Sequence, residues 1–384
     1  MSIEFDNSLK ASELRKASKS CRQGVNHKDS VMKYDDNCLL SNDRLGREVR
    51  DDTYSISKYV HFTITEPKVR EIDATKYRDR VWQRSMTNNG VREMLTKNFI
   101  YDNGACQKNK GTDFAICRVI YFLQDYYRRN GSNEGYGAHL DIKGFFPNTP
   151  HEVAKARVRE RVYVPEFSYH ICMVVDSCKD KRPQEEIDED PFGERGSLLG
   201  SELMQMVQLA IPDHVDHHIK EDMGIKYYCR FNDDFLFFHR DKEVVKEVIE
   251  YIQTEMAKLG LSVVNKGGIF KLNESFRFLR KRFILTDTGK VIIRIDQKSL
   301  GEERRRLKRM KRLVDEGKRT MDAVRRHYQS WSSSALRADS EGAIRKMDEF
   351  YFNIFGEKPE GRKRHAYPRS KRAVKKRKAK KRRT

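Results

Sequence analysis

Two adjacent carboxylates, Asp233 and Asp234, are the residues of this chain with the clearest potential for chemistry. They lie between two aromatic, β-prone runs, residues 227–231 and 235–238, and this pattern predicts a hairpin with both carboxylates at its tip. Two neighbouring anions in an apolar frame repel each other and lose hydration, and a divalent cation would relieve both costs. On this segment alone, a polar turn is the simpler interpretation.

A third carboxylate, Asp141, ends a short predicted strand, residues 137–141, and precedes a tight turn and two aromatic residues. A single Asp at a strand end commonly caps a helix or a turn. A two-metal site, however, needs a carboxylate from a second strand so that ions about 3.5–4 Å apart can be bridged. Between the two segments lies a glycine-rich turn, residues 195–201, that leads into a helix with an apolar face. We therefore predict that Asp141 joins the hairpin pair in one metal site.

These segments, in this order, resemble reverse transcriptases of the bacterial, group-II-intron-like branch. Residues 140–147 are similar to the first catalytic motif of the family, residues 199–205 to its glycine motif, and residues 231–234 to its aromatic-x-Asp-Asp motif. The resemblance extends from about Tyr59 to about Phe355. Further stretches that match in the expected order are residues 66–72, 78–81 and 99–106, with 110–112.

The resemblance implies an α+β fold of the right-hand polymerase type, with fingers, a ferredoxin-like palm and a helical thumb. The expected segments are a polar helical N-terminal extension (1–57), fingers (58–135), palm (136–296) with an exposed insertion at about 169–194, helical thumb (297–356) and a basic disordered tail (357–384).

The implied activity is RNA-directed DNA synthesis by two-metal nucleotidyl transfer. Two Mg²⁺ ions, with Mn²⁺ as a substitute, would be held by Asp141, the backbone carbonyl of Ile142, Asp233 and Asp234, with Asp234 the less direct ligand. The expected partners are an RNA template, a DNA or RNA primer, dNTPs, a cognate structured RNA and an accessory protein. The expected setting is a bacterial retroelement of the diversity-generating or retron-like type, or an anti-phage defence system.

The resemblance also implies a nucleotide site. Its members are Lys68, Arg70, Phe146, Gly200, Gln205 and Lys266. Lys68 and Arg70 would grip the triphosphate, although both equally fit a solvated strand edge. The ring of Phe146 would lie beneath the sugar and exclude a 2′-hydroxyl; an ordinary core phenylalanine is the alternative. Lys266 would lie near the pyrophosphate as a general acid, where a plain exposed lysine is the simpler interpretation.

Several positions depart from the family pattern. Asn232 replaces the usual Ala or Met before the carboxylates, and residues 278–283 are more basic than the usual primer-grip motif. Leu199, an aliphatic residue before the glycine, with Gln205 at the end of the motif, resembles diversity-generating retroelements. Met204 replaces the Ser of relatives. None of these changes removes a predicted metal ligand.

The net charge of the chain indicates a polyanionic partner. The chain contains 78 Lys and Arg against 57 Asp and Glu, which gives +21. Residues 360–384 carry 14 of these cations and one Glu, and such a run binds nucleic acid with steep salt dependence. A second basic segment, residues 299–317, combines cations with apolar residues at helical spacing. Its expected nucleic-acid contacts are Arg304, Arg305, Lys308 and Arg312, and a solvated helix face is the alternative.

The remaining sequence narrows the class of protein. Seven scattered cysteines without a Cys-x-x-Cys pair favour reduced thiols, and neither a signal segment nor an apolar membrane span is visible, so we expect a cytoplasmic protein that binds no membrane. The alternative functions are an RNA-templated RNA polymerase, a template-independent or protein-primed nucleotide polymerase, and a non-catalytic RNA-binding protein on a palm fold. The complete set of three aspartates argues against the non-catalytic protein.

Overall fold

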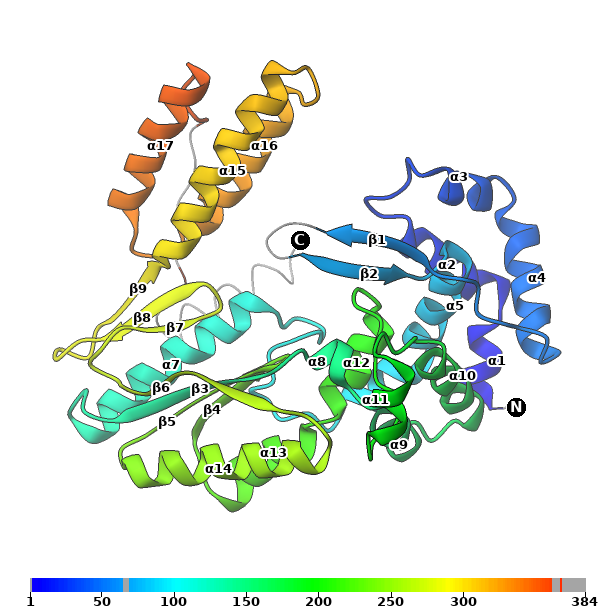
Figure 1. Ribbon diagram of the computed structural model, residues 1–384, viewed down its shortest axis with the longest axis horizontal. Helices are drawn as coiled ribbons and strands as arrows, with labels where there is room; N and C mark the ends of the chain where they lie inside the picture. Colours follow the sequence, from blue (N-terminus) through cyan, green and yellow to red (C-terminus); the bar gives the residue numbers. More distant parts are fainter. Residues whose placement is uncertain (1, 65–68, 361–366, 368–384) are drawn as a thin grey trace.

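The computed structural model describes residues 2–64, 69–360 and 367 of the chain, in a mixed arrangement of helices and sheets (Figure 1). A central sheet of four strands has the order β4-β5-β3-β6, with antiparallel neighbours throughout. Its strands are β3 (Tyr136–Ile142), β4 (Tyr227–Phe231), β5 (Asp234–His239) and β6 (Val263–Lys271). Helices separate β3 from β4, and one helix separates β5 from β6, which is the β-α-β-β-α-β arrangement of ferredoxin-like sheets.

Both faces of this sheet are covered, which explains why β5 is a continuous apolar run rather than an alternating one. On one face, helix α14 (Lys242–Lys258) packs residues at helical spacing, such as Val248 and Ile252, into the same core as Phe235 and Phe237. On the opposite face, helix α7 (Thr112–Asn130) forms a second core with Leu236, Phe238 and other strand residues.

A bundle of short helices forms the N-terminal part. Its members are α1 (Ile3–Ser8), α2 (Ala11–Cys21), α3 (Asp29–Asp36), α4 (Cys38–Arg50), α5 (Tyr77–Met86), η1 (Thr87–Val91) and α6 (Arg92–Thr96). Leu14 of α2 and Trp82 of α5 are buried in the core shared with the central sheet. Between α4 and α5, the two-stranded antiparallel ribbon of β1 (Val60–Ile64) and β2 (Arg70–Ala74) extends outward, with β1 exposed along its length.

A third group of helices connects β3 to β4. It comprises α8 (Phe145–Asn148), α9 (His151–Arg161), α10 (Pro165–Asp176), α11 (Gln184–Glu189), α12 (Glu202–Ala210), α13 (Asp213–His217) and η2 (His218–Asp222). The expectation of an exposed insertion at 169–194 is wrong for its first part. Residues 169–176 belong to α10, and Ile171 and Val174 are buried because the helix presents an apolar face to the core.

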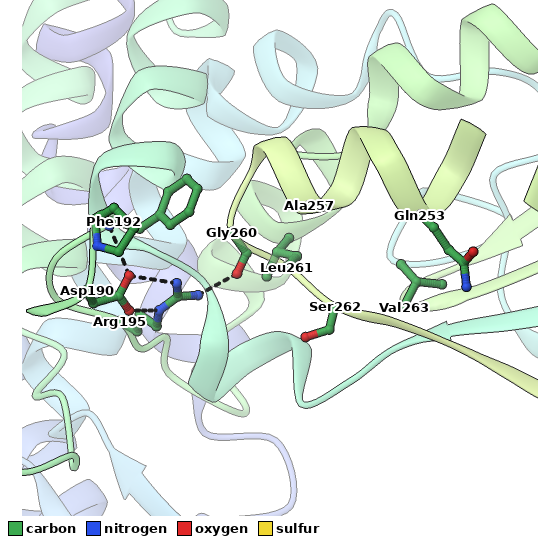
Figure 2. Close-up of a pocket in the computed structure, with 10 residues that line it drawn as sticks. Asp190, Phe192, Arg195, Gln253, Ala257, Gly260, Leu261, Ser262 and Val263 are labelled. Atoms are coloured by element: carbon green, nitrogen blue, oxygen red, sulfur yellow. Dashed lines mark hydrogen bonds and ion pairs between the residues drawn. The ribbon is translucent and has the colours of Figure 1, made fainter. Parts of the chain in front are cut away.

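The rest of that stretch is largely exposed, as expected, and α11 buries none of its residues, but ion pairs hold it at Arg182 and Asp190. Arg195 forms an ion pair with Asp190 at 2.5 Å and donates to the carbonyl oxygen of Gly260, beyond the end of α14 (Figure 2). Arg182 binds Asp190 as well, at 2.6 Å. Asp190 and Arg195 line, together with Phe192, a pocket of about 460 Å³. Part of the charged composition thus builds an ion-pair network, while the acidic residues of α11 stay exposed.

The C-terminal part continues from β6 into a small antiparallel sheet and three helices. The sheet contains β7 (Phe276–Phe278), β8 (Lys281–Leu285) and β9 (Val291–Ile295), and the helices are α15 (Gln297–Asp315), α16 (Met321–Ala335) and α17 (Glu341–Phe355). In Figure 1 these helices and the β1–β2 ribbon lie on the same side of the central sheet. Residues 361–366 and 368–384 of the expected basic tail are outside the described residues. Across the described part of the chain, every helix is too short or too polar to cross a bilayer.

Candidate active site

Three aspartates converge at one end of the central sheet. Asp141, in β3, pairs directly with Asp234, the first residue of β5, and Phe231 at the end of β4 pairs with the same Asp234. Asn232 and Asp233 therefore form the tip of the predicted hairpin. Asn232 has φ of 56°, a left-handed conformation that asparagine tolerates better than most residues. One carboxylate oxygen from each of Asp141, Asp233 and Asp234 lies within 4.8 Å of the others.

Backbone hydrogen bonds fix the strand that carries Asp141. The N–H of Ile142 donates to the carbonyl oxygen of Asp233 at 3.1 Å, and the N–H of Lys143 donates to the carbonyl oxygen of Ser262 at 2.9 Å. The chain then turns at Gly144, whose φ of 58° is left-handed; a Cβ there would lie 2.7 Å from the side-chain amide of Asn148. The end of β3 is thus held between β5 and β6, and Asp141 with it.

The electrostatics of the three aspartates are unequal. Burial raises the pKa of Asp233 to about 6, and the neighbouring charges of Asp234 and Asp141 act in the same direction. Burial would also raise the pKa of Asp234, but a hydrogen bond from His139 and the ammonium of Lys266 outweigh it, so this pKa is lowered. Asp233 is therefore the carboxylate with the least compensation from the protein itself.

Lys266 provides the only ammonium that the structure places among these carboxylates in the described part of the chain. Its Nζ lies 2.7 Å from Oδ1 of Asp141 and 2.9 Å from Oδ1 of Asp234. One ammonium against three carboxylates leaves an excess of negative charge at close range. The donors are all carboxylate oxygens, which are the ligands that hard divalent cations such as Mg²⁺ prefer. The donor set therefore fits a divalent cation, as the sequence predicted.

His139 is a member of the site that the sequence reasoning missed. It lies two residues before Asp141 on the same face of β3, and its Nε2 is 2.7 Å from Oδ1 of Asp234. The ring is largely buried and packs edge-on against Phe278 of β7, with ring centroids 5.5 Å apart. The signal was present, because a histidine in an apolar strand at a spacing of two from a candidate ligand must share its face.

A buried ion pair supports the hairpin from behind, and it was also missed. Arg230 and Asp216 are both fully buried, with Nη2 of Arg230 2.7 Å from Oδ2 of Asp216. Further donations from Arg230 reach the carbonyl oxygens of Leu209, at 2.7 Å, and Asn232, at 3.1 Å. Tyr228 donates its hydroxyl to Asp216. A charged residue inside the aromatic run 227–231 was the available signal for such a pair.

Gln205, one of the predicted nucleotide-site residues, lies close to the hairpin tip. Cys106 donates through Sγ to Oε1 of Gln205 at 3.2 Å and is 3.9 Å from Oδ1 of Asn232, so it links Gln205 to the tip. These contacts border a pocket of about 430 Å³. Its lining residues are Arg92, Cys106, Gln107, Lys108, Glu202 and Gln205. Gly200 is exposed at the turn before α12, with φ of 100° and open space where a Cβ would lie.

Phe146 lies in α8, directly after the Gly144 turn, and is half-buried against the ring of Phe145. Arg70 is exposed at the start of β2, in a different sheet from the aspartates. Lys68 lies outside the described residues.

The basic segment forms helix α15 as predicted, with Leu307 and Met310 buried. Its four predicted nucleic-acid contacts, Arg304, Arg305, Lys308 and Arg312, are exposed. The guanidinium of Arg304 also lies over the ring of Phe350, 5.9 Å from its centroid.

Comparison with known proteins leaves the family open. No protein-family model and no curated protein matches the chain. Among solved structures, it matches apo telomerase from Candida tropicalis truncated from its C-terminal domain, with 12% sequence identity and a TM-score of 0.42. The match covers 65% of this chain and 58% of the telomerase chain, so this chain spans less than two thirds of that protein. A TM-score of that size does not establish a shared fold, and function must be argued from the site itself.

Proposed function

We propose that this protein is an RNA-directed DNA polymerase that joins nucleotides by two-metal nucleotidyl transfer. The observation that carries the proposal is the convergence of Asp141 with Asp233 and Asp234 on adjacent antiparallel strands, with carboxylate oxygens within 4.8 Å. Such a group of carboxylates can hold two hard cations side by side, which is what phosphoryl transfer between two oxygens requires. The β-α-β-β-α-β order of the sheet supports the same proposal, because it is the order expected of a polymerase palm.

The remaining elements fit the other parts of a right-hand polymerase. We propose that the ribbon β1–β2 and the helices up to α7 act as fingers, that the central sheet is the palm, and that α15–α17 are the thumb. Figure 1 places the ribbon and the three C-terminal helices on one side of the central sheet. The exposed cations of α15 would then follow the phosphates of a bound duplex.

The chemistry divides between the cations and the side chains. Bound Mg²⁺ would lower the pKa of the primer 3′-hydroxyl and stabilise charge on the phosphate oxygens. Asp141 and Asp233 would hold the ions, with the carbonyl of Ile142 as a further oxygen ligand. Asp234 would support the geometry, since His139 and Lys266 already contact its Oδ1. Lys266, displaced from Asp141 by a bound ion, would donate a proton to the leaving pyrophosphate.

Selection of the nucleotide would come from residues around the hairpin. The ring of Phe146, five residues after Asp141, would close the space beside the sugar 2′-carbon and favour dNTPs. The pocket beside Gln205, with Arg92 and Lys108 in its wall, would receive the nucleotide or the template base. Arg70 and Lys68 would approach the triphosphate from the ribbon. A bacterial retroelement or defence system, with its own structured RNA, is the setting we propose.

Primer extension tests the proposal. The full-length protein would be supplied with an RNA template, a DNA primer, dNTPs and Mg²⁺, beside the Asp233→Asn variant. Extension by the wild type that the variant lacks would support the proposal. Addition of nucleotides without a template would favour a terminal transferase instead. Failure of both proteins to extend, on templates that include the RNA that co-purifies with the wild type, would favour a non-catalytic RNA-binding role.

A further inference from the structure

An exposed aromatic ring with two cations lies beside the hairpin, outside the residues assigned above. Tyr101, in the segment between α6 and α7, is 60% exposed. Nζ of Lys110 lies 5.5 Å from the centroid of its ring, and the guanidinium carbon of Arg118 lies 5.1 Å from it. Phe114 packs edge-on against the same ring at 5.4 Å. With three fifths of its surface open, the ring is supported by these neighbours rather than enclosed by them.

The segment that carries Tyr101 is rigidly attached to the central sheet. Asn103 forms a parallel bridge with Arg230 of β4, and the N–H of Gly104 donates to the carbonyl oxygen of Arg230 at 2.9 Å. Lys110 also donates to the carbonyl oxygen of Tyr101 at 2.9 Å. Tyr101 therefore lies two residues before Asn103, which pairs with β4. Strand β4 leads directly to Asp233.

The ring also lies on the side of the sheet that bears the aspartates. Strand register places Asp141, Asp234 and Phe231 on one face, and α7 packs against that same face. Phe114 and Arg118, which contact Tyr101, belong to α7. A nucleic-acid strand that leaves or approaches the carboxylates along this edge would pass the ring.

The charge around the ring is positive. Arg118 pairs with Asp102 at 2.5 Å, and Lys220 contacts the same carboxylate at 2.9 Å. One buried carboxylate is thus shared by two cations, and Lys110 adds a third. Phosphates are attracted by such an excess, and a base can stack on an exposed ring whatever its identity.

We propose that Tyr101 is a stacking platform for an unpaired base of single-stranded nucleic acid, with Lys110 and Arg118 as the cations that attract its phosphates. This combination of an exposed aromatic face and adjacent positive charge is the usual design of sites that bind single strands without sequence preference. The site needs neither metal nor nucleotide, so it extends the proposed function without depending on catalysis.

Binding of a roughly 12-nucleotide oligo(U) RNA, followed by fluorescence anisotropy in EDTA, tests the platform. In the full chain, Tyr101→Ala should weaken binding by about five- to 100-fold, whereas Tyr101→Trp should bind like the wild type. Tyr163→Ala is the matched control, because Tyr163 is also exposed, at 65%, with Nζ of Lys97 5.6 Å from its ring centroid. The control should bind like the wild type.

An abasic strand of the same length separates stacking from charge. Tyr101→Ala and the wild type should bind the abasic strand equally. On oligo(U), the weaker binding of Tyr101→Ala should persist at raised salt, because salt does not screen stacking. Equal binding by Tyr101→Ala and wild type on oligo(U), or an equal loss on both strands, would overturn the proposal. Because the readout is metal-free binding, these outcomes stay separate from success or failure in primer extension.

Discussion

Lys266 is placed where a metal ion would be expected: its Nζ lies 2.7 Å from Oδ1 of Asp141 and also contacts Asp234. An ammonium and a divalent cation would compete for these oxygens. A bound metal would therefore have to displace the lysine from at least one of its two ion pairs, and this exchange would set part of the metal affinity.

Replacing Lys266 should strengthen metal binding and weaken catalysis. We expect Lys266→Met to raise the affinity for Mn²⁺ by about tenfold, because removal of a competing cation worth roughly 1.4 kcal/mol has that effect. Electron paramagnetic resonance of free Mn²⁺ would measure it. Lys271→Met, at a likewise exposed lysine at the far end of the same strand, is the control. An unchanged affinity in Lys266→Met would show that the lysine does not compete.

The raised pKa of Asp233 predicts that Asp233→Asn stabilises the metal-free protein. The native pKa of about 6 exceeds the unfolded value of 3.8, so ionisation opposes folding. This cost is absent below the unfolded pKa and fully present above the native one. Above about pH 7 the variant should gain about 3 kcal/mol in the free energy of unfolding, and near pH 3 it should gain nothing.

Thermal unfolding in EDTA across this pH range measures the gain. Mg²⁺ should then stabilise the wild type and leave Asp233→Asn nearly unaffected. Asp287→Asn, at an exposed carboxylate, should show neither effect. A variant that is less stable than the wild type above about pH 7 would contradict the electrostatic account.

His139 should act as a positioning residue for Asp234. His139→Leu removes the 2.7 Å contact to Oδ1 and should lower metal affinity and extension rate by about ten- to 100-fold, with little change in KM for dNTPs. His139→Gln, which keeps a donor near the position of Nε2, should recover much of the loss. If both variants lose equally, the histidine matters only through its packing against Phe278.

Phe146 should control the choice of sugar. Phe146→Val opens the space beside the half-buried ring, so incorporation of ribonucleotides should rise by about tenfold or more relative to dNTPs. Single-nucleotide insertion with matched dNTP and NTP gives the ratio. Phe146→Tyr keeps the ring and should keep the preference. An unchanged ratio in Phe146→Val would exclude the ring as the gate.

The ion pair behind the hairpin should be essential for stability. Asp216→Ala leaves Arg230 buried without its counter-charge and should cost about 3–5 kcal/mol in the free energy of unfolding. The double variant Asp216→Leu/Arg230→Met should recover most of this, because it removes both charges from the core. Denaturant unfolding compares the three proteins. A small loss in Asp216→Ala would mean that water reaches the guanidinium.

The parts of the site that could be predicted are those coded by local pattern. The hairpin around Asp233 follows from aromatic runs on both sides of a polar pair, and helix α15 follows from apolar residues at helical spacing. Contacts that depend on register were less accessible. The contact of His139 with Asp234 exists only because β3 and β5 pair as they do.

For long-range ion pairs, the sequence could signal a buried charge, such as Arg230 in its aromatic run, but not the partner of that charge. Arg230 and Asp216 lie 14 residues apart, in a strand and a helix whose packing no local pattern specifies. The stretch 169–194 was expected to be exposed on account of its charges, which holds for α11, but Arg182 and Arg195 pair with Asp190 directly after that helix. Composition reports charge but not whether the charges find partners.

The attachments of Arg230 have a mechanical consequence. Its backbone bonds to the segment at Asp102 and Gly104, while its side chain holds Asp216 and the carbonyl oxygen of Asn232. The tip that carries Asp233 is thus clamped from the sheet edge, from the helices behind it and from within the hairpin. In the proposed polymerase, a strand lengthened by one nucleotide at a time would move past a fixed hairpin tip. Any element that opens or closes during the reaction would have to come from other parts of the chain.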